Sequence, residues 1–212
     1  MLSTYFLNNF RQLPHYDPEY NLTVITPPTA EPASYDEFAD QVRLDQTDDQ
    51  AYVTALGMAA RQYVETSCKL SLMQATYKVQ FDCFHDCGMK LPRRPVQSVT
   101  SVQYLDINGT LQTLSPSTYQ VDVKSTWTRI LPVVGTCFPV TQIGQTNAVT
   151  ITFVAGTATD PANVSELAKL AITSLVAFWY ENREAAASEK KPQELPYAFE
   201  AILWMLGAPE AG

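Results

Sequence analysis

Prolines interrupt the spacing of apolar residues at the beginning of the chain. Each proline removes a backbone donor and restricts the residue before it. We therefore predict an extended arm over residues 1–33, without a helix or a strand. The first ten residues are too apolar for a purely solvated tail, so we expect the arm to lie on its own domain or on a neighbour. The prolines of the arm are Pro14, Pro18, Pro27, Pro28 and Pro32.

Helical spacing begins after the arm. Ser34 precedes Glu37 by three residues, which is the arrangement of a capping box and predicts a short helix to about Leu44. Thr47, followed by acidic residues, predicts a longer helix through about Cys68. Apolar residues recur at helical spacing in this second segment, which predicts one stripe facing a core. The stripe consists of Tyr52, Leu56, Ala59 and Tyr63, with Ala55 and Ala60 beside it.

From residue 74 the spacing changes to strict alternation, as in a half-buried strand. Ala75, Tyr77, Val79 and Phe81 are the apolar positions of the first such segment. The sequence Asp106-Ile107-Asn108-Gly109 has the chemistry of a hairpin turn. We predict a compact, mostly antiparallel β unit. Its further strands are expected at 96–105, 110–114, 119–123, around 128–131 and at 148–154.

The helical period returns after residue 160. Asn163 with Glu166 is interpreted as a helix cap, and the apolar spacing predicts a helix ending near Glu184, with Leu167, Leu170, Ala171, Ser174, Leu175 and Phe178 on one face. Residues 197–206 predict a short, very apolar helix.

The order of these elements predicts an α+β fold, in which a small helical bundle carries an inserted β domain. We divide the chain into an arm (1–33), a first helical part (34–73), the β domain (74–160), a second helical part (161–206) and a tail (207–212).

Composition restricts the class of protein. No apolar run approaches the ~20 residues that a membrane helix needs, so no membrane span is expected. We identify no secretory signal, and the four cysteines are expected to be free thiols of a protein made in a cytoplasm. The net charge of −8 argues against a protein that wraps nucleic acid, because such binders neutralise phosphates with Lys and Arg.

Candidate catalytic and metal-binding groups are few. The two histidines are His15, in the arm, and His85, and neither is well placed as a general base; nucleotide-binding and serine-nucleophile motifs are absent. Cys83, His85 and Cys87 are ligand types that zinc prefers, but no second ligand pair is apparent, which favours a plain loop. We therefore expect no enzyme, no catalytic residue, no metal and no cofactor.

Charged pairs have structural explanations. Asp48 and Asp49 fit a helix N-terminus, and Asp82 and Asp86 fit a solvated loop. Arg93-Arg94, between two prolines, has the chemistry to contact a phosphate or a carboxylate, but a solvated or interface ion pair is favoured.

The last predicted helix has a surplus of apolar side chains. Large apolar patches mark interaction sites, so the segment indicates a partner. It equally fits a helix that closes the core of its own bundle, and the exposure of Trp204 separates these interpretations.

Several phrases together resemble one protein family. They are residues 34–45 followed by Thr-Asp-Asp (47–49), Ala-Ala-Arg-Gln-Tyr-Val-Glu (59–65), Leu-Pro-Arg-Arg-Pro-Val-Gln-Ser-Val (91–99), Tyr-Leu-Asp to Gly-Thr (104–110) and Trp-Tyr-Glu-Asn-Arg-Glu (179–184). The chain is similar, from about Leu22 to Leu206, to the head-tail connector (adaptor) proteins of tailed bacteriophages, the long gp6-like type that gene transfer agents also have.

The resemblance implies a virion protein of the neck, between head and tail. It implies a ring, usually of twelve subunits, beneath the portal protein, which extends the DNA channel and receives stopper or tail components. Genomic DNA would pass without sequence-specific binding, and we expect a neutral to negative lumen. Residues 1 to about 21 have no counterpart in typical members; our hypothesis is that they brace the capsid or a neighbouring subunit.

The resemblance also assigns residues. The C-terminal segment would bind the portal through Tyr197, Phe199, Ile202, Leu203, Trp204, Met205 and Leu206. Subunit-contact or structural roles are expected for Arg93, Arg94, Trp179, Tyr180, Arg183 and Glu184. The competing functions are another neck or tail-completion ring protein, such as a stopper, and a metal-dependent enzyme built on Cys83, His85 and Cys87.

Overall fold

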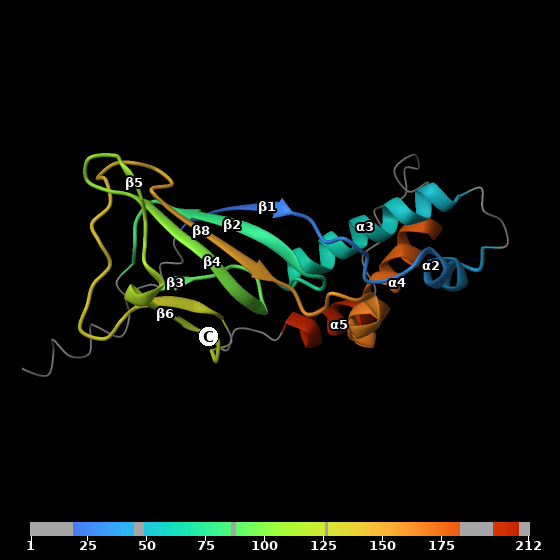
Figure 1. Cartoon of the computed structure of the whole chain (residues 1–212). Coiled ribbons are helices and arrows are strands. Elements are labelled where there is room, and N and C mark those ends of the chain that lie inside the picture. Colours follow the sequence, from blue (N-terminus) through green and yellow to red (C-terminus); the bar gives the residue numbers. More distant parts are fainter. Residues whose placement is uncertain (1–18, 45–48, 86–87, 126, 183–196, 208–212) are drawn as a thin grey trace, which may run out of the picture.

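The computed structural model describes residues 19–44, 49–85, 88–125, 127–182 and 197–207. These residues form an elongated molecule, with helices at one end and β-sheets at the other (Figure 1). Apart from one strand that comes before them all, two helices precede the strands in the chain and two follow them. They are α2 (Tyr35–Val42), α3 (Gln50–Ser67), α4 (Glu166–Glu181) and α5 (Tyr197–Gly207). The predicted α+β fold, with an antiparallel β unit between helices, is confirmed.

Two antiparallel sheets form the β unit. The larger has the strand order β1-β2-β8-β4-β5, and the smaller has the order β3-β7-β6. The strands are β1 (Asn21–Thr26), β2 (Ala75–Phe81), β3 (Met89–Lys90), β4 (Val96–Leu105), β5 (Leu111–Thr113), β6 (Tyr119–Asp122), β7 (Arg129–Pro132) and β8 (Val149–Ala155). Strand β8 therefore lies in the middle of the larger sheet, between β2 and β4.

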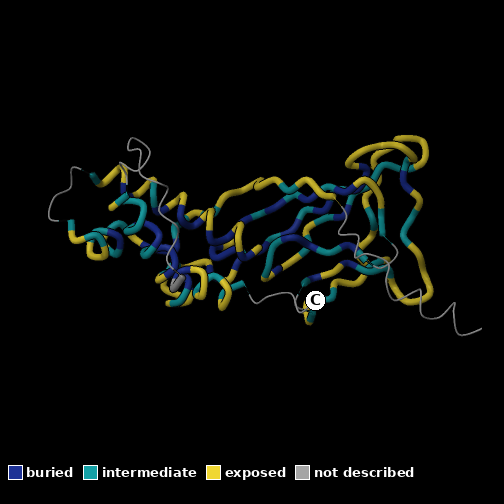
Figure 2. Tube along the Cα trace, turned by 180° about the vertical axis from the view of Figure 1, so that it is seen from behind, coloured by how far each residue is buried: buried dark blue, intermediate teal, exposed yellow. Residues whose placement is uncertain are grey.

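Alternation along β2 and β8 creates the core of the β unit. In both strands every second residue is buried, so one face of each packs inward. Tyr77 stacks on Phe153 with ring centroids 5.6 Å apart. Met89 and Ile130, from the smaller sheet, lie in the same buried cluster. Figure 2 shows these buried segments as dark blue stretches along the strands. The predicted alternation of β2 is confirmed.

The prediction that residues 1–33 contain no regular element is wrong. Strand β1 pairs with β2 at the edge of the larger sheet. The segment has no proline of its own, since Pro18 precedes it and Pro27 follows it, so its amides are available for the ladder. The prolines thus mark the ends of a strand. Residues 1–18 lie outside the described part of the chain.

The capping box of α2 is confirmed. The Ser34 hydroxyl accepts the Glu37 N–H, and the Glu37 carboxylate accepts the Ser34 N–H at 2.6 Å. For α3, the predicted cap Thr47 lies outside the described residues. The N-cap position of α3 is Asp49, whose side chain makes no capping hydrogen bond.

The buried face of α3 is shifted by one position along the chain from the predicted stripe. Val53, Gly57, Ala60, Arg61, Val64 and Glu65 are buried, whereas Tyr52, Ala59 and Tyr63 are exposed. The tyrosine rings lie along the margin of the contact with α4, since Tyr52 faces Tyr180 and Tyr63 faces Trp179, each at 6.2 Å between centroids. The two tyrosines of α3 therefore border the helical core and do not fill it.

Helix α4 also differs in detail from its prediction. Its N-cap is Ser165, which accepts the Ala168 N–H, and not Asn163, which ends a short 3-10 turn. The buried face consists of Ala168, Ala171, Ile172, Leu175 and Val176, whereas Leu170 is exposed. The helix ends at Glu181, three residues before the predicted end.

The segment between α3 and β2 joins the helical core to the β unit through two isolated parallel bridges, Leu70 with Arg94 and Met73 with Ala158. Helix α4 packs against α2, α3 and α5. At the junction Ser71 donates its N–H to the Arg94 carbonyl and accepts the Thr157 N–H, and its hydroxyl lies 2.6 Å from the Tyr77 hydroxyl. Gly156 is required there, because a Cβ would lie 2.4 Å from the Gln74 Cα and the backbone φ is +149°.

Replacing Ser34 with alanine is expected to destabilise the fold by about 1 kcal/mol, because α2 loses its cap. The measurement is the free energy of unfolding in urea. Ser34→Thr keeps the hydroxyl and should lose less. The hydrogen bond from the Ser34 N–H and then Lys169 lower the pKa of Glu37. The stabilisation that the ionised Glu37 carboxylate provides is therefore present at neutral pH and is lost as the pH falls through its folded-state pKa. Equal unfolding midpoints for Ser34→Ala and the wild type would contradict the prediction.

Candidate protein-interaction surface

One face of α5 closes the helical core. Phe199 is only 4% exposed and its ring lies 6.2 Å from that of Tyr63. Ile202, Leu203 and Leu206 are partly buried against the same core. The helix is therefore an integral part of the bundle, and its removal would open the core to water.

The other face of α5 carries large exposed apolar side chains. Trp204 is 65% exposed and Met205 is 62% exposed. Phe199 therefore closes the core of the bundle, whereas Trp204 and Met205 face outward, and binding of a partner there stays a prediction. Tryptophan and methionine are enriched in protein interfaces, so these two residues form a candidate contact patch. The side chain of Tyr197 lies outside the described part of the structure.

The C-terminal turn of α5 is held by hydrogen bonds to its carbonyls. The Cys68 thiol donates to the Leu203 carbonyl at 3.4 Å, and Arg94 donates to the Gly207 carbonyl. Burial raises the pKa of the Cys68 thiol, which keeps this donor protonated. A helix end needs such donors because its last carbonyls have no partner within the helix. The position of Trp204 is thus fixed by α3 and by the segment before β4.

Arg93 and Arg94 both contact the chain's own backbone. Arg93 donates to the carbonyl of Glu65 and, at 3.0 Å, to that of Leu70. Together with Arg94 on Gly207, this ties the end of α3 and the end of α5 to the beginning of the sheet. The two arginines therefore have a structural role, and their contact with another subunit stays a prediction.

The other predicted contact residues lie on α4. The Tyr180 hydroxyl donates to Asp49 at 2.5 Å, which links α4 to the beginning of α3. Trp179 packs edge-on against Tyr63. Arg183 and Glu184 lie outside the described residues.

The loop with the candidate zinc ligands is described only in part. Cys83 is exposed, and the following Phe84 stacks on Phe138 at 4.6 Å between centroids. Asp82 accepts the Asn147 N–H at 2.8 Å, and His85 donates its N–H to the Met89 sulfur. Asp86 and Cys87 lie outside the described residues. Among the residues that are described, no three His, Cys, Asp or Glu side chains are grouped to hold a metal ion. None of the described helices is long and apolar enough to cross a membrane.

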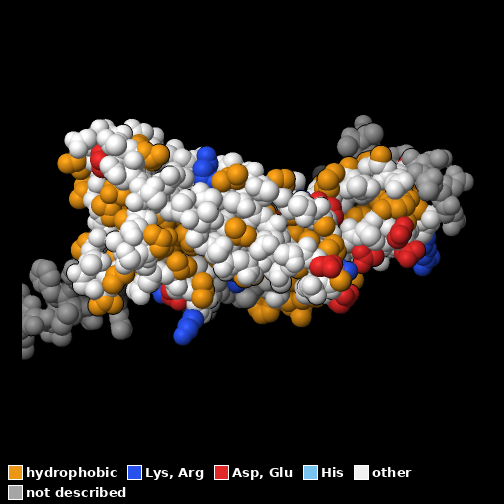
Figure 3. All heavy atoms as spheres, in the orientation of Figure 1, with side chains coloured by type: hydrophobic (Ala, Val, Ile, Leu, Met, Phe, Trp, Pro, Cys, Tyr) orange, Lys and Arg blue, Asp and Glu red, His pale blue; other side chains and the backbone are white. Residues whose placement is uncertain are grey.

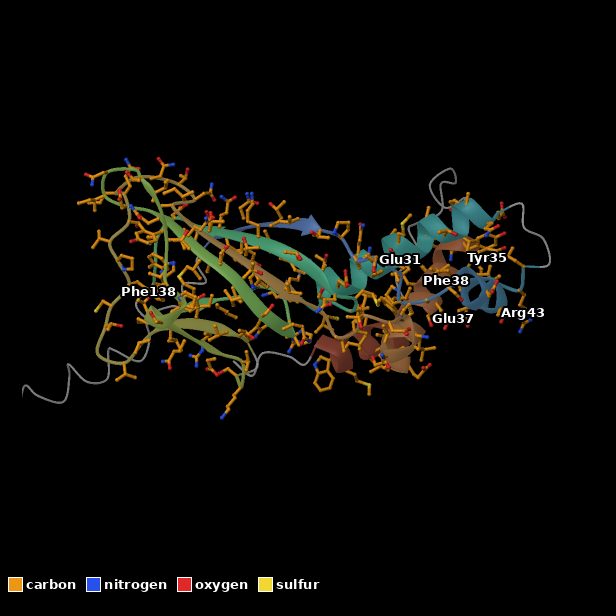
Figure 4. The ribbon with its side chains drawn as sticks, viewed as in Figure 1. Glu31, Tyr35, Glu37, Phe38, Arg43 and Phe138 are labelled. Atoms are coloured by element: carbon orange, nitrogen blue, oxygen red, sulfur yellow. The ribbon has the colours of Figure 1, made fainter. Side chains whose placement is uncertain are left out.

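A second exposed surface was not predicted from the sequence. It is the loop end of the β unit, far from the helices, where Phe138 also lies (Figure 4). Its exposed apolar residues are Ile107, Leu111, Val134, Val140 and Ile143. We call these residues the loop-end surface. Val134 is 88% exposed and Ile143 is 94% exposed.

The two ends of the molecule differ in their content of charged residues. From Ile130 to Thr159 the chain contains no charged residue. Figure 3 shows acidic side chains over the helices and few charges of either sign over the sheets. Depletion of charge is typical of interface cores, and this run without charge is the signal that could have indicated the loop-end surface.

Three solved structures have chains with a similar fold. One, described as the virion of a native gene transfer agent (GTA) particle, matches with a TM-score of 0.72 and 20% identity over 87% of this chain and 94% of that chain. The neck of an empty GTA particle, computed with C6 symmetry, matches at 0.71 and 21% over 88% and 94%. The neck of a native GTA particle, computed with C12 symmetry, matches at 0.63 and 22% over 89% and 94%.

No protein-family model and no curated protein matches the chain. What the three matches establish is the fold: helices and antiparallel sheets of this chain are arranged as in chains of GTA particles, over nearly their whole length.

Proposed function

We propose that this protein is a structural component of the neck of a phage-like particle, the head-tail adaptor. The observation that carries the proposal is the fold, which is similar over 94% of chains from GTA virion and neck structures. In this role the protein forms a ring beneath the portal, extends the DNA channel and provides the attachment site for stopper or tail components. No catalytic step is part of it.

The contact with the portal is assigned to α5. Trp204 and Met205 supply the exposed apolar anchors, and Phe199, Ile202, Leu203 and Leu206 hold the helix in place from behind. A rigidly held anchor is an advantage, because less conformational entropy is lost on binding.

The contact between subunits is assigned to the loop-end surface. Two of the similar structures were computed with C6 and C12 symmetry, which supports a ring, with twelve copies as the proposed number. A closed ring needs two different surfaces on each subunit that fit one another. The loop-end surface, which has few charges, supplies one of them, and the partly buried Trp179 and Tyr180 near the end of α4 are our candidates for the other.

The charge of the chain suits a channel through which DNA moves. With 14 basic and 22 acidic residues, the protein has little positive charge to neutralise phosphates. Several of its cations are also engaged by carboxylates, as in the Arg129–Asp122 and Lys169–Glu37 pairs. We propose that DNA passes without sequence-specific binding.

Image reconstruction of purified particles tests the proposal. We expect a ring of this chain directly below the portal, with Trp204 and Met205 at the contact. A position farther down, with no portal contact, would instead make the protein a stopper. Absence of the chain from the neck would overturn the proposal.

Replacing both Val134 and Ile143 with glutamate is expected to prevent ring formation while leaving the fold intact. Both side chains are almost fully exposed, so the monomer accepts the charges, whereas an interface would have to bury them unpaired. The readout is the number of copies per particle by quantitative mass spectrometry, where we expect a decrease of tenfold or more. The matched Val134→Gln/Ile143→Gln variant adds polarity without charge and should assemble better. Wild-type copy numbers for the glutamate variant would disprove the assignment.

A further inference from the structure

Trp127 is surrounded by positive charge. The Lys90 Nζ lies 4.5 Å from the centroid of the Trp127 ring, the Arg94 Cζ lies at 4.9 Å and the Lys69 Nζ lies at 5.4 Å. These residues come from separate segments: Lys69 follows α3, Lys90 is in β3, Arg94 precedes β4 and Trp127 precedes β7. We call the four residues the Trp127 cluster. The fold thus gathers three cations around one aromatic ring.

Two of these cations have no neutralising carboxylate among the residues that the structure describes. Neither Lys69 nor Arg94 is in an ion pair within the described part of the chain; the pairs there are Arg61–Glu31, Arg61–Glu65, Arg129–Asp122 and Lys169–Glu37. Cations held close together repel one another, and cation–π contacts offset this only in part. In a chain with a net charge of −8, such a concentration of positive charge is a local exception. An anion would stabilise it.

Two buried donors at the same place have no acceptor in the described part of the chain. The Trp127 Nε1 and the Arg94 Nε are buried, and neither has a hydrogen-bond partner among the described residues. A buried N–H group without an acceptor costs free energy, so such groups in folded proteins normally have one. The missing acceptor and the excess positive charge are independent observations that call for the same ligand, a negatively charged oxygen.

The cluster adjoins the C-terminal turn of α5. Arg94 donates to the carbonyl of Gly207, the last residue of this helix, and Trp204 and Met205 lie within the same turn. A partner that covers the exposed face of α5 would therefore reach the cluster. That partner would present an apolar surface to Trp204 and Met205 and an acidic group beside it.

We propose that the Trp127 cluster binds a carboxylate of the protein that docks on α5. The inference rests on the proposed function for the partner's identity, the portal protein, but the anion site stands on the geometry of the cluster. A carboxylate is favoured over a DNA phosphate because the adjacent surface is apolar, whereas DNA binding needs a longer basic surface. An aspartate or glutamate of the portal would accept from the exposed Lys69 and would neutralise the positive charge around the Trp127 ring.

The first test uses the full chain and a hexaglutamate peptide as the probe. The readout is the Trp127 indole N–H resonance, assigned by its absence in Trp127→Phe. We expect it to shift on titration in the wild type and to shift at least tenfold less at the same peptide concentration in Lys69→Asn. Lys69 is exposed and has a φ of +52°, which asparagine accepts, so this variant should fold. Lys78→Asn, on β2, removes the same charge elsewhere and should behave as the wild type.

Three results would overturn the proposal that the Trp127 cluster binds a protein carboxylate. They are the absence of a shift, a shift that persists in Lys69→Asn, and a stronger response to duplex DNA at equal phosphate and carboxylate concentrations. A response that appears only in Glu210→Gln would mean that the chain's own Glu210 occupies the cluster, which also overturns the proposal.

The second test measures co-sedimentation with purified portal rings at increasing NaCl concentration. We expect Lys69→Asn and Trp127→Phe to weaken binding about tenfold and Lys69→Asn to reduce the salt dependence, with Lys78→Asn unchanged. Failure of the wild type to bind portal rings, together with a response to hexaglutamate, would remove the proposed function and keep the anion site. Portal binding that is equal in all variants would remove the cluster from the interface and leave the proposed function intact.

Discussion

Replacing Trp204 and Met205 with alanine will weaken binding to portal rings about a hundredfold or more while leaving the helical bundle folded. Both side chains are more than half exposed, so their loss costs the free protein little. Exposed tryptophans that become buried in an interface are typical hot spots, worth about 2 kcal/mol or more each, and about 1.4 kcal/mol is a factor of ten in affinity. The measurement is the dissociation constant from co-sedimentation with portal rings.

Phe199→Ala is the contrasting variant on the same helix. Its ring is buried, so truncation should destabilise the fold by roughly 3–5 kcal/mol, and any loss of binding should follow from unfolding. The two variants thus separate the contact face of α5 from its core face. A double alanine variant of Trp204 and Met205 that binds portal rings as tightly as the wild type would refute the assignment of this helix.

Replacing Arg61 with methionine will destabilise the protein by about 3–5 kcal/mol, because it leaves a buried carboxylate without its ion pair. Arg61 is buried; its guanidinium donates to Glu65 at 2.9 Å and to Glu31 at 2.7 and 3.2 Å. Glu31 lies in the segment that follows β1, beside α3 (Figure 4). The pair therefore attaches that segment to α3. Urea unfolding measures the loss.

The pH dependence of the Arg61→Met variant provides a second readout. Burial raises the pKa of Glu65, and the Leu72 N–H and the positive charge of Arg61 oppose this rise. Without Arg61 the pKa rises further, so the folded state holds a proton that the unfolded state releases, and stability falls as the pH increases through that pKa. The deficit should be larger at pH 8 than at pH 5.

A double variant tests the cause of this loss. Arg61→Met/Glu65→Gln removes the buried charge and keeps an acceptor for the Leu72 N–H, so it should be more stable than Arg61→Met alone. A loss below about 1 kcal/mol for Arg61→Met, or one that does not change with pH, would disprove this account of the pair.

Local signals made much of this fold predictable from the sequence. The capping box at Ser34 and the alternation from Ala75 to Phe81 depend only on neighbouring residues, and both were predicted correctly. Strand β1 was missed because its flanking prolines obscured a short segment whose partner, β2, lies some fifty residues away. The buried side of α3 includes Arg61, which can be buried because its charge is paired. Its partner Glu31 lies thirty residues earlier in the chain, so the pattern within the helix does not indicate it.

The candidate site was predictable only as a segment. Within a helix as apolar as α5, the sequence does not tell which side chains face the core, because nearly every position would tolerate burial. Phe199 and Trp204 were both predicted to bind the portal, yet one is buried in the bundle and the other faces outward. The Trp127 cluster depends on residues from four segments, and no spacing along the chain indicates it.

The central place of β8 has a consequence for synthesis on the ribosome. Its partners β2 and β4 emerge first, but they cannot join one another until residues 149–155 have been made. Likewise, α2 and α3 cannot complete the helical core until α4, which follows β8 in the chain, has been made. A chain released before β8 has been made therefore has neither a complete larger sheet nor a complete helical core. Its unpaired strand edges make it prone to aggregation or proteolysis. The proposed assembly into a particle therefore depends on a chain that has been made through α5, which closes the helical core.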